Sequence, residues 1–252
     1  MAEKKARSKG PGHLAKDQGV ALVTGVSQGL GSVLVKKFQA QGYKVCGLAR
    51  SRERECPADL DLKVSVANRR DLAKAIKKCR DELGPIQVLV NNAGLAGSDF
   101  VEGRFLPAVW DEIMAVNLGG PYNLLSLAVE HLQEEGRIIN IGSVLSFQGT
   151  NDQLAYCTAK HGLIGLTRAM ALALASRGIT VNAVCPGWMP TEMARQRAKE
   201  LGITSKTQAA AAPLGRMVST DEVADLVLYL CSPSARSITG QAFVVDAGAS
   251  LL

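Results

Sequence analysis

The 252 residues of this chain are 47% hydrophobic and 21% charged, which suits one α/β domain or two small ones with a sizeable core. No apolar run approaches the ~18 residues of a membrane span, and the N-terminus lacks the apolar stretch of a signal peptide. The net charge is +6, but positions 1–18 hold five basic and two acidic residues (5 − 2 = +3), and aromatic residues make up only 4%. We therefore expect a basic, disordered tail at 1–18 and no nucleic-acid partner.

Six cysteines are scattered along the chain, and no two of them form a CxxC pair. Such spacing does not favour a metal site, and scattered reduced thiols are typical of cytoplasmic proteins. We therefore expect a cytoplasmic protein without a metal ion.

The first predicted unit is a strand, a glycine-rich turn and a helix. Residues 19–24 form a short apolar run typical of a buried parallel strand, and the helix that follows the turn has an apolar face and ends near Gly42. Bare glycines let a backbone approach a pyrophosphate, which the N–H groups of a helix N-terminus then face. This unit predicts a dinucleotide site, although a tight turn that binds nothing has the same local pattern. The residues of the turn are Gly25, Ser27, Gln28, Gly29, Leu30 and Gly31.

The second predicted strand, 43–49, ends at Arg50 and Ser51. In a dinucleotide-binding fold the residue after this strand lies at the adenosine ribose, where an acid suits NAD and an arginine suits the 2′-phosphate of NADP. Arg50 therefore predicts NADP(H), with Arg52 as a candidate helper. The alternative is a solvated loop charge.

Strands and helices alternate through the rest of the chain without a linker or an internal repeat. This alternation predicts one catalytic domain over 19–252 with an α/β fold: a Rossmann-like, doubly wound sheet of seven parallel strands with helices on both faces. Residues 188–215 lack a strand and are expected to form a lid with two short helices near 191–201 and 204–212. The other strands are expected at 62–66, 86–90, 137–141, 179–184 and 241–246, and the other helices at 68–83, 107–131, 156–176 and 219–231.

Polar residues follow the third apolar strand and interrupt the next helix. The run Asn91-Asn92-Ala93-Gly94 fits the ligand crevice at the carboxyl edge of an open α/β sheet. Asn117 stands before Gly119-Gly120-Pro121, where proline removes a helix hydrogen bond, so we expect a kink or break. A freed carbonyl or the Asn117 amide is a candidate to hold a water, unless Asn117 only marks the break.

Tyr156 and Lys160 are four residues apart, a spacing that stacks them on one face of a helix. A neighbouring ammonium lowers the pKa of a phenol from its ordinary ~10, so the pair is suited to proton transfer. Ser143 precedes this helix, where a loop can bring its hydroxyl beside the phenol. A Tyr and a Lys at this spacing also occur by chance on many helices. Beyond Lys160 the helix is apolar nearly all round, so we expect it to pack on the sheet and at a subunit interface.

Taken in order, these motifs resemble the short-chain dehydrogenase/reductase family over residues 19–248. The runs at 178–187 and 213–216 look most similar to those of 3-oxoacyl-thioester and polyketide ketoreductases. The motifs that carry the resemblance are Thr24-Gly25-xxx-Gly29-x-Gly31, Asn91-Asn92-Ala93-Gly94, Asn117, Ser143 with twelve residues before Tyr156-xxx-Lys160, and Pro186-Gly187 with Thr191.

The resemblance implies a set of catalytic and cofactor-binding residues. Tyr156 would donate the proton in carbonyl reduction, Lys160 would lower its pKa and hold the nicotinamide ribose, and Ser143 would bind the substrate carbonyl. Asn117 would anchor a water in a proton relay. The cofactor contacts implied beyond the glycine turn, Arg50 and Lys160 are Ser51, Asn92, Ala93, Gly94, Tyr156, Pro186, Gly187, Met189 and Thr191. Such proteins are commonly homotetramers.

We therefore expect an NADPH-dependent carbonyl (keto) reductase acting on a small-molecule carbonyl or alcohol, with acyl thioesters among the candidates. The alternatives are an NAD-dependent alcohol dehydrogenase that works in the oxidative direction, and a dinucleotide-binding module without turnover. Arg195 and Arg197 in the expected lid either meet an anionic carrier or are solvated charges.

Overall fold

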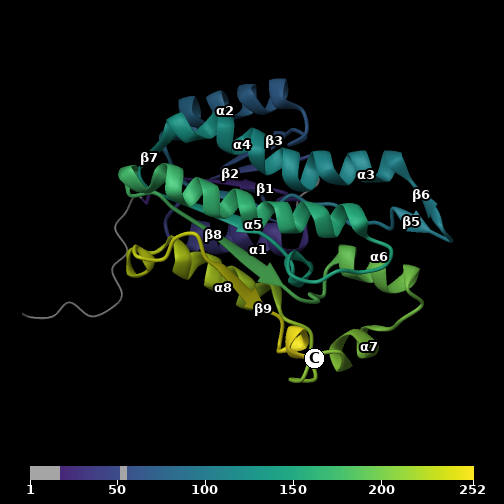
Figure 1. Cartoon of the computed structure of the whole chain (residues 1–252). Helices are drawn as coiled ribbons and strands as arrows, with labels where there is room; N and C mark the ends of the chain where they lie inside the picture. The colour runs from purple at the N-terminus through teal and green to yellow at the C-terminus, as the bar shows by residue number, and fades with distance from the viewer. Residues whose placement is uncertain (1–17, 52–55) are drawn as a thin grey trace, which may run out of the picture.

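A parallel sheet of seven strands forms the centre of the molecule, as predicted (Figure 1). The computed structural model describes residues 18–51 and 56–252, so the predicted tail, apart from Gln18, and Arg52 lie outside the described residues. Every neighbouring pair of strands in this sheet is parallel. In spatial order the strands are β3 (Leu60–Lys63), β2 (Lys44–Ala49), β1 (Val20–Thr24), β4 (Ile86–Asn91), β7 (Leu132–Ile141), β8 (Thr180–Pro186) and β9 (Ala242–Val245).

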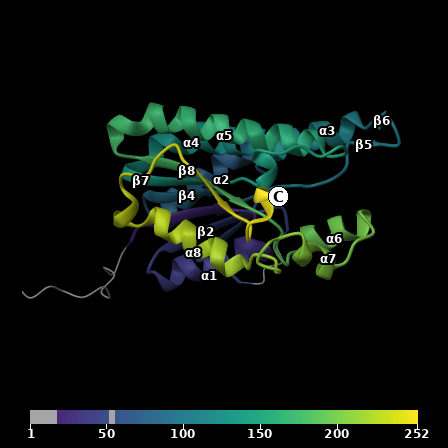
Figure 2. The ribbon, with the colours of Figure 1, turned by 60° about the horizontal axis from the view of Figure 1, so that its bottom comes forward.

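Helices cover both faces of the sheet, because alternate side chains of each buried strand point to opposite sides. On one face α1 (Gly29–Ala40) and α8 (Thr220–Cys231) pack in one core cluster with Ala21 and Val23 of β1. On the other face α2 (Arg69–Leu83), α4 (Gly120–Ala128) and α5 (Leu154–Leu174) pack with Val20 and Leu22. Figure 2 shows the sheet between these two helical layers.

Local signals explain where several helices begin. Asn68 caps α2 by accepting a hydrogen bond from the backbone N–H of Asp71. At α8 the run Ser219-Thr220-Asp221-Glu222 predicts a capping box, and the structure confirms it: the hydroxyl of Ser219 accepts from the N–H of Glu222, and the N–H of Ser219 donates to the Glu222 carboxylate. These caps place the two helices within a residue or two of their predicted starts.

Several segments differ from the predicted elements. Strand β3 covers Leu60–Lys63 instead of the predicted 62–66. Strand β7 begins at Leu132, five residues before the predicted start, and its pairing with β4 shifts register after Ile86. The region 95–106, for which no helix or strand is predicted, contains a hairpin of β5 (Phe100–Val101) and β6 (Arg104–Phe105). Its turn residues Glu102 and Gly103 both have positive φ, as a tight two-residue hairpin requires.

The segment expected to form a lid contains α6 (Glu192–Glu200) and α7 (Ser205–Ala210) and no strand. Both helices lie beyond the carboxyl end of β8, to one side of the sheet (Figure 2). Among the helices that the structure describes, none has the length and apolarity needed to cross a membrane.

Candidate active site

The glycine-rich turn after β1 is closely packed. Gly25 has φ +73, and its N–H donates to the carbonyl of Leu48 at 2.7 Å. A Cβ on Gly31 would lie 2.0 Å from the carbonyl oxygen of Gly25, so a side chain there requires the turn to move. Helix α1 begins at Gly29, and its N-cap residue Gln28 makes no side-chain capping bond. The N–H groups of the first turn therefore lack a side-chain cap and suit an anion.

The predicted Asn-Asn-Ala-Gly run braces this turn from the neighbouring strand. The Asn92 side-chain amide donates to the carbonyls of Thr24, at 2.9 Å, and Gly25, at 3.1 Å. The hydroxyl of Thr24 accepts in return from the N–H groups of Asn92 and Ala93. The Asn92 amide is therefore committed to holding the turn. Thr24, which the sequence interpretation did not place in the site, supplies the other half of the brace.

A pocket of about 230 Å³ lies between the start of α1 and the start of α6. Gln28, Gly29 and Ser32 line one side of it, and Thr191 and Arg195 line the other. A Cβ on Gly29 would lie 3.3 Å from the methyl carbon of Thr191, whose hydroxyl caps α6 by accepting from the N–H of Ala194. The fold thus brings Gly29 and Thr191 together as the two walls of one pocket.

The residues predicted after β8 form a rim continuous with this pocket. Pro186 ends β8, and the N–H of Gly187 donates to the carbonyl of Val245 at 3.0 Å. The N–H of Thr191 donates to the carbonyl of Met189 at 2.7 Å. These bonds hold residues 186–191 against β9 and the beginning of α6.

Arg50 and Ser51 follow β2 at the same sheet edge, as predicted. The Arg50 guanidinium lies 3.5 Å from the carboxylate of Glu112 in α3 (Pro107–Met114), and more than half of each side chain is exposed. Such an exposed pair contributes little to stability, so Glu112 does not prevent Arg50 from contacting an anion.

Tyr156, Lys160 and Ser143 come together at the carboxyl end of β7. Tyr156 lies in the first turn of α5 and Lys160 one turn later, with the ammonium nitrogen 5.5 Å from the centre of the phenol ring. The ammonium donates to the carbonyl of Ile141, the last residue of β7, at 2.7 Å. Ser143, two residues on, lies near enough to the Tyr156 phenol to lower its pKa. The predicted grouping of these three side chains is therefore present in the structure.

The electrostatics of this group differ from the expectation for Tyr156. Although part of its side chain remains accessible, burial raises the pKa of Tyr156 to about 12, and the nearby Ser143 side chain only partly offsets the rise. Burial lowers the pKa of Lys160 to about 8. Here Lys160 does not lower the pKa of Tyr156, since desolvation of the phenol dominates and the ammonium contacts the Ile141 carbonyl.

Asn117 lies in a π-helical turn, Ala115–Gly119, between α3 and α4. The expected kink or break is replaced by a wider turn that keeps the helix continuous. Both polar atoms of its amide contact Leu95, accepting from the N–H and donating to the carbonyl at 2.8 Å each. A Cβ on Gly94 would lie 3.5 Å from the Asn117 amide oxygen and 4.0 Å from the Lys160 nitrogen. Gly94, Asn117 and Lys160 therefore share one site.

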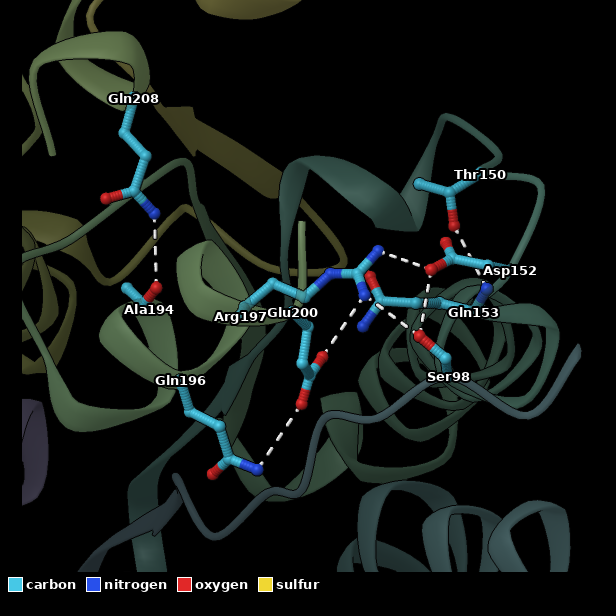
Figure 3. A network of polar contacts seen from close by, with 9 residues as sticks. All are labelled: Ser98, Thr150, Asp152, Gln153, Ala194, Gln196, Arg197, Glu200 and Gln208. Atoms are coloured by element: carbon cyan, nitrogen blue, oxygen red, sulfur yellow. Dashed lines mark hydrogen bonds and ion pairs between the residues drawn. The ribbon is translucent and has the colours of Figure 1, made fainter. Parts of the chain in front are cut away.

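The two lid arginines have different environments. Arg195 is exposed and pairs with Glu192 at 2.7 Å, while it also lines the pocket beside Gly29. Arg197 is only 8% exposed and forms an ion pair with Asp152 (Figure 3), so it is not a solvated charge. The sequence gives no signal of this pairing, because the two residues are 45 positions apart.

The chain is similar to known proteins over most of its length. A family model described as Enoyl-(Acyl carrier protein) reductase matches residues 25–250. The chain is 35% identical over 239 residues to the 3-oxoacyl-(acyl-carrier-protein) reductase FabG of Vibrio cholerae, covering 91% of this chain and 96% of that protein. It is 34% identical over 238 residues to the acetoacetyl-CoA reductase of Rhizobium meliloti, covering 91% and 97%.

Two solved structures share the fold. The aldohexose dehydrogenase of Thermoplasma acidophilum in ligand-free form superposes with a TM-score of 0.87 at 31% identity, covering 96% of this chain and 97% of that one. A blue fluorescent protein from a metagenomic library, in complex with NADPH, has a TM-score of 0.82 at 29% identity, covering 92% and 98%.

Proposed function

Because this chain belongs to the short-chain dehydrogenase/reductase family, we propose that it is an NADPH-dependent ketoreductase in which Tyr156 donates the proton. Like its relatives, it is an NAD(P)-dependent oxidoreductase acting on CH–OH and C=O groups. The observation that carries the proposal is the position of the Tyr156, Ser143 and Lys160 group at the carboxyl edge of the sheet that also carries the glycine turn.

The nucleotide is proposed to lie along this edge of the sheet, because the residues present fit it. The carbonyl of Gly25 leaves no room for a Cβ on Gly31, so the turn lies tightly against the start of α1. The N–H groups at that start have no side-chain cap and suit a pyrophosphate. When bound, the nicotinamide supplies the hydride. The proposed contacts are Gly25, Ser27, Gln28, Gly29, Leu30, Gly31, Arg50, Ser51, Asn92, Ala93, Gly94, Tyr156, Lys160, Pro186, Gly187, Met189 and Thr191. The side chain of Leu30 is buried, so its contact is proposed through the backbone.

The proton is proposed to move from the phenol of Tyr156 to the carbonyl oxygen. A pKa of about 12 keeps this phenol protonated at neutral pH, which is the form that a donor requires. Ser143 is proposed to hold the carbonyl through its hydroxyl. Asn117 fixes Leu95, the residue after Gly94, and Pro121 lacks the N–H that would donate to a carbonyl of the π-helical turn. A water bound at this turn is the proposed route by which the proton is replaced.

Reversing the charge of Arg50 should change the coenzyme preference. We expect Arg50→Asp to shift the ratio of kcat/KM for NADPH over NADH by roughly ten- to a hundredfold toward NADH, because the 2′-phosphate loses a charged partner. Steady-state kinetics with both coenzymes measure the ratio. Glu112→Gln is the matched control, since it removes the carboxylate beside Arg50 and should leave NADPH preferred. An unchanged ratio in Arg50→Asp would show that Arg50 does not meet the phosphate.

The pH dependence of reduction should report Lys160. An ammonium is charged below its pKa, so Lys160 loses its charge as the pH rises through about 8, while the phenol of Tyr156 keeps its proton until about 12. We expect kcat/KM for a ketone to be level below pH 7 and to fall above pH 8, since kcat/KM reports groups of the free enzyme. Lys160→Met should lower the rate and abolish this break. A break that persists in Lys160→Met belongs to another group.

The substrate class is proposed from the relatives and from the site together. The names of two relatives are those of a 3-oxoacyl-(acyl-carrier-protein) reductase and an acetoacetyl-CoA reductase, so β-ketoacyl thioesters are the first substrates to test. The aldohexose dehydrogenase supports the oxidative alternative with a sugar alcohol group. A panel of β-ketoacyl thioesters, quinones and cyclic ketones with NADPH, beside aldohexoses with NAD, distinguishes the two directions.

Three further features remain proposals. We propose that 19–252 acts as one catalytic domain with residues 188–215 as its lid, since α6 contributes a wall of the nucleotide pocket. We also propose a homotetramer that buries the outer face of α5, where Leu172 is 83% exposed. Light scattering of the full chain gives the subunit number.

A further inference from the structure

A cluster of polar side chains around the buried Arg197 fastens α6 to the loop that precedes α5 (Figure 3). One nitrogen of the Arg197 guanidinium donates to the Asp152 carboxylate at 2.6 Å. The other terminal nitrogen donates to the Ser98 hydroxyl at 2.9 Å and to the Glu200 carboxylate at 3.2 Å. The Ser98 hydroxyl in turn donates to Asp152 at 2.8 Å. Arg197 thus ties two separate loops to its own helix.

The cluster continues through the backbone to the first turn of α5. The carbonyl of Asp152 accepts from the N–H groups of Asp99, at 3.0 Å, and Phe100, at 3.3 Å. The carboxylate of Asp99 accepts from the N–H of Ala155 at 3.1 Å. Ala155 directly precedes Tyr156. An unbroken series of contacts therefore runs from Arg197 in α6 to the residue beside the proposed proton donor.

Asp99 holds the start of α5 through a buried carboxylate. Its side chain is 2% exposed, and its second carboxylate oxygen has no partner among the described residues. A carboxylate at a helix N-terminus is stabilised by the unpaired N–H groups and the helix dipole. Asp99 and the first turn of α5 therefore fix each other, and Asp99 itself is placed by the Asp152 backbone.

We infer that Arg197, Asp152 and Asp99 are positioning residues that couple the seating of α6 to the placement of Tyr156. The inference rests on the proposed role of Tyr156 as proton donor. An ion pair that only supports the fold can often be replaced by uncharged residues without loss. If the pair couples α6 to α5, in contrast, removing the Arg197–Asp152 contact disturbs the placement of Tyr156 even when no unpaired charge remains.

The cluster also borders a pocket of about 390 Å³. Asp152, Arg197 and Ser98 line it together with the apolar side chains of Phe100 and Leu201. A substrate chain that enters this pocket would contact the groups that hold α6 in place. Substrate binding and the position of α6 would then depend on the same contacts of Arg197, Asp152 and Ser98.

The test compares Arg197→Met and the double variant Arg197→Met/Asp152→Asn in the full chain. The double variant removes both charges of the pair, so no unpaired Asp152 carboxylate remains. It therefore distinguishes loss of the contact between α6 and the 150–155 segment from the cost of an unpaired charge. Lys199→Met is the control, since Lys199 is an exposed cation of the same helix. The readouts are kcat and KM with NADPH and acetoacetyl-CoA, NADPH affinity by calorimetry, and hydrogen exchange of the amides at 154–158.

Both Arg197 variants should lower kcat/KM by roughly ten- to a hundredfold, because a small misplacement of a reacting group has effects of that size. Exchange at 154–158 should rise in both, while NADPH affinity should change less than about threefold because the phosphate pocket is formed by the opposite end of α6. Lys199→Met should match the wild type. Recovery of wild-type kcat/KM and exchange in the double variant would overturn the inference.

Asp99 offers a second test that does not depend on the ion pair. Asp99→Asn keeps an acceptor for the N–H of Ala155, whereas Asp99→Ala removes it, so exchange at 154–158 should rise more in the alanine variant. Equal exchange in the two variants would contradict the role of Asp99. If the wild-type chain reduces no ketone with NADPH, the proposed function fails, and the exchange measurements still decide whether α6 and α5 are coupled.

Discussion

Replacing Tyr156 with phenylalanine should lower kcat for ketone reduction with NADPH by roughly 10²- to 10⁴-fold, the usual contribution of a positioned general acid. The substitution removes the phenol hydroxyl beside Ser143 and Lys160 and leaves the ring packed in the first turn of α5. NADPH affinity should change little, because the phosphate cradle lies at the start of α1. Single-turnover measurements under saturating NADPH separate the chemical step from binding.

Tyr229→Phe is the matched control, because it removes a phenol hydroxyl from a half-exposed position on α8. Its kcat should equal that of the wild type. If Tyr156→Phe keeps kcat within about tenfold of the wild type, another group or water donates the proton, and the proposed role of Tyr156 is wrong.

Adding one methyl group at Gly31 should abolish tight coenzyme binding. The new Cβ would lie 2.0 Å from the carbonyl oxygen of Gly25, so the glycine turn and the start of α1 must separate. We expect the NADPH dissociation constant of Gly31→Ala to rise by at least ~100-fold, equivalent to about 3 kcal/mol, together with a lower melting temperature from the overpacked turn. Calorimetric titration and thermal unfolding measure the two effects.

Gly165→Ala is the control, since a Cβ at this position in α5 meets no atom within 4 Å. NADPH affinity should be unchanged there. Should Gly31→Ala not fold, Gly29→Ala provides a second test, because its Cβ would lie 3.3 Å from a Thr191 side-chain atom, a looser contact than the 2.0 Å at Gly31, while its φ of +58 still disfavours a side chain. Wild-type affinity in a folded Gly31→Ala protein would contradict the proposed phosphate cradle.

The predictable parts of this molecule are those that short sequence patterns encode. The apolar run before Gly25 and the glycine spacing after it predicted β1, the turn and α1. The Ser219 and Glu222 pair predicted the start of α8, and the four-residue spacing of Tyr156 and Lys160 predicted that both lie on one face of α5. Each of these features depends on residues within a turn or two of each other.

The features that sequence reasoning missed depend on contacts between distant segments. The π-helical turn at Asn117 is held by Leu95, and the Lys160 ammonium is held by the carbonyl of Ile141. Leu95 and Ile141 both act through backbone atoms, so their side chains give no sign of these contacts in the sequence. The burial of Arg197 against Asp152 is likewise invisible in a helix whose other basic residues are exposed.

The pKa of Tyr156 shows the same limit in electrostatic terms. The presence of Lys160 one turn away predicted a lowered pKa, but desolvation of the phenol raises it to about 12. The sign of the shift depends on how deeply the fold buries the ring and on what the ammonium contacts. Spacing alone therefore identifies the pair but not its protonation.

Transfer of deuterium tests the central proposal most directly. The full chain is incubated with NADPH that carries deuterium at both C4 positions of the nicotinamide and with acetoacetyl-CoA or a cyclic ketone, and the alcohol is analysed by mass spectrometry. Our account predicts one deuterium at the carbinol carbon of the product for each NADPH oxidised, and none in Tyr156→Phe on the same timescale. NADPH binding without any deuterated alcohol across the whole carbonyl panel would contradict it and would indicate a dinucleotide-binding protein without turnover.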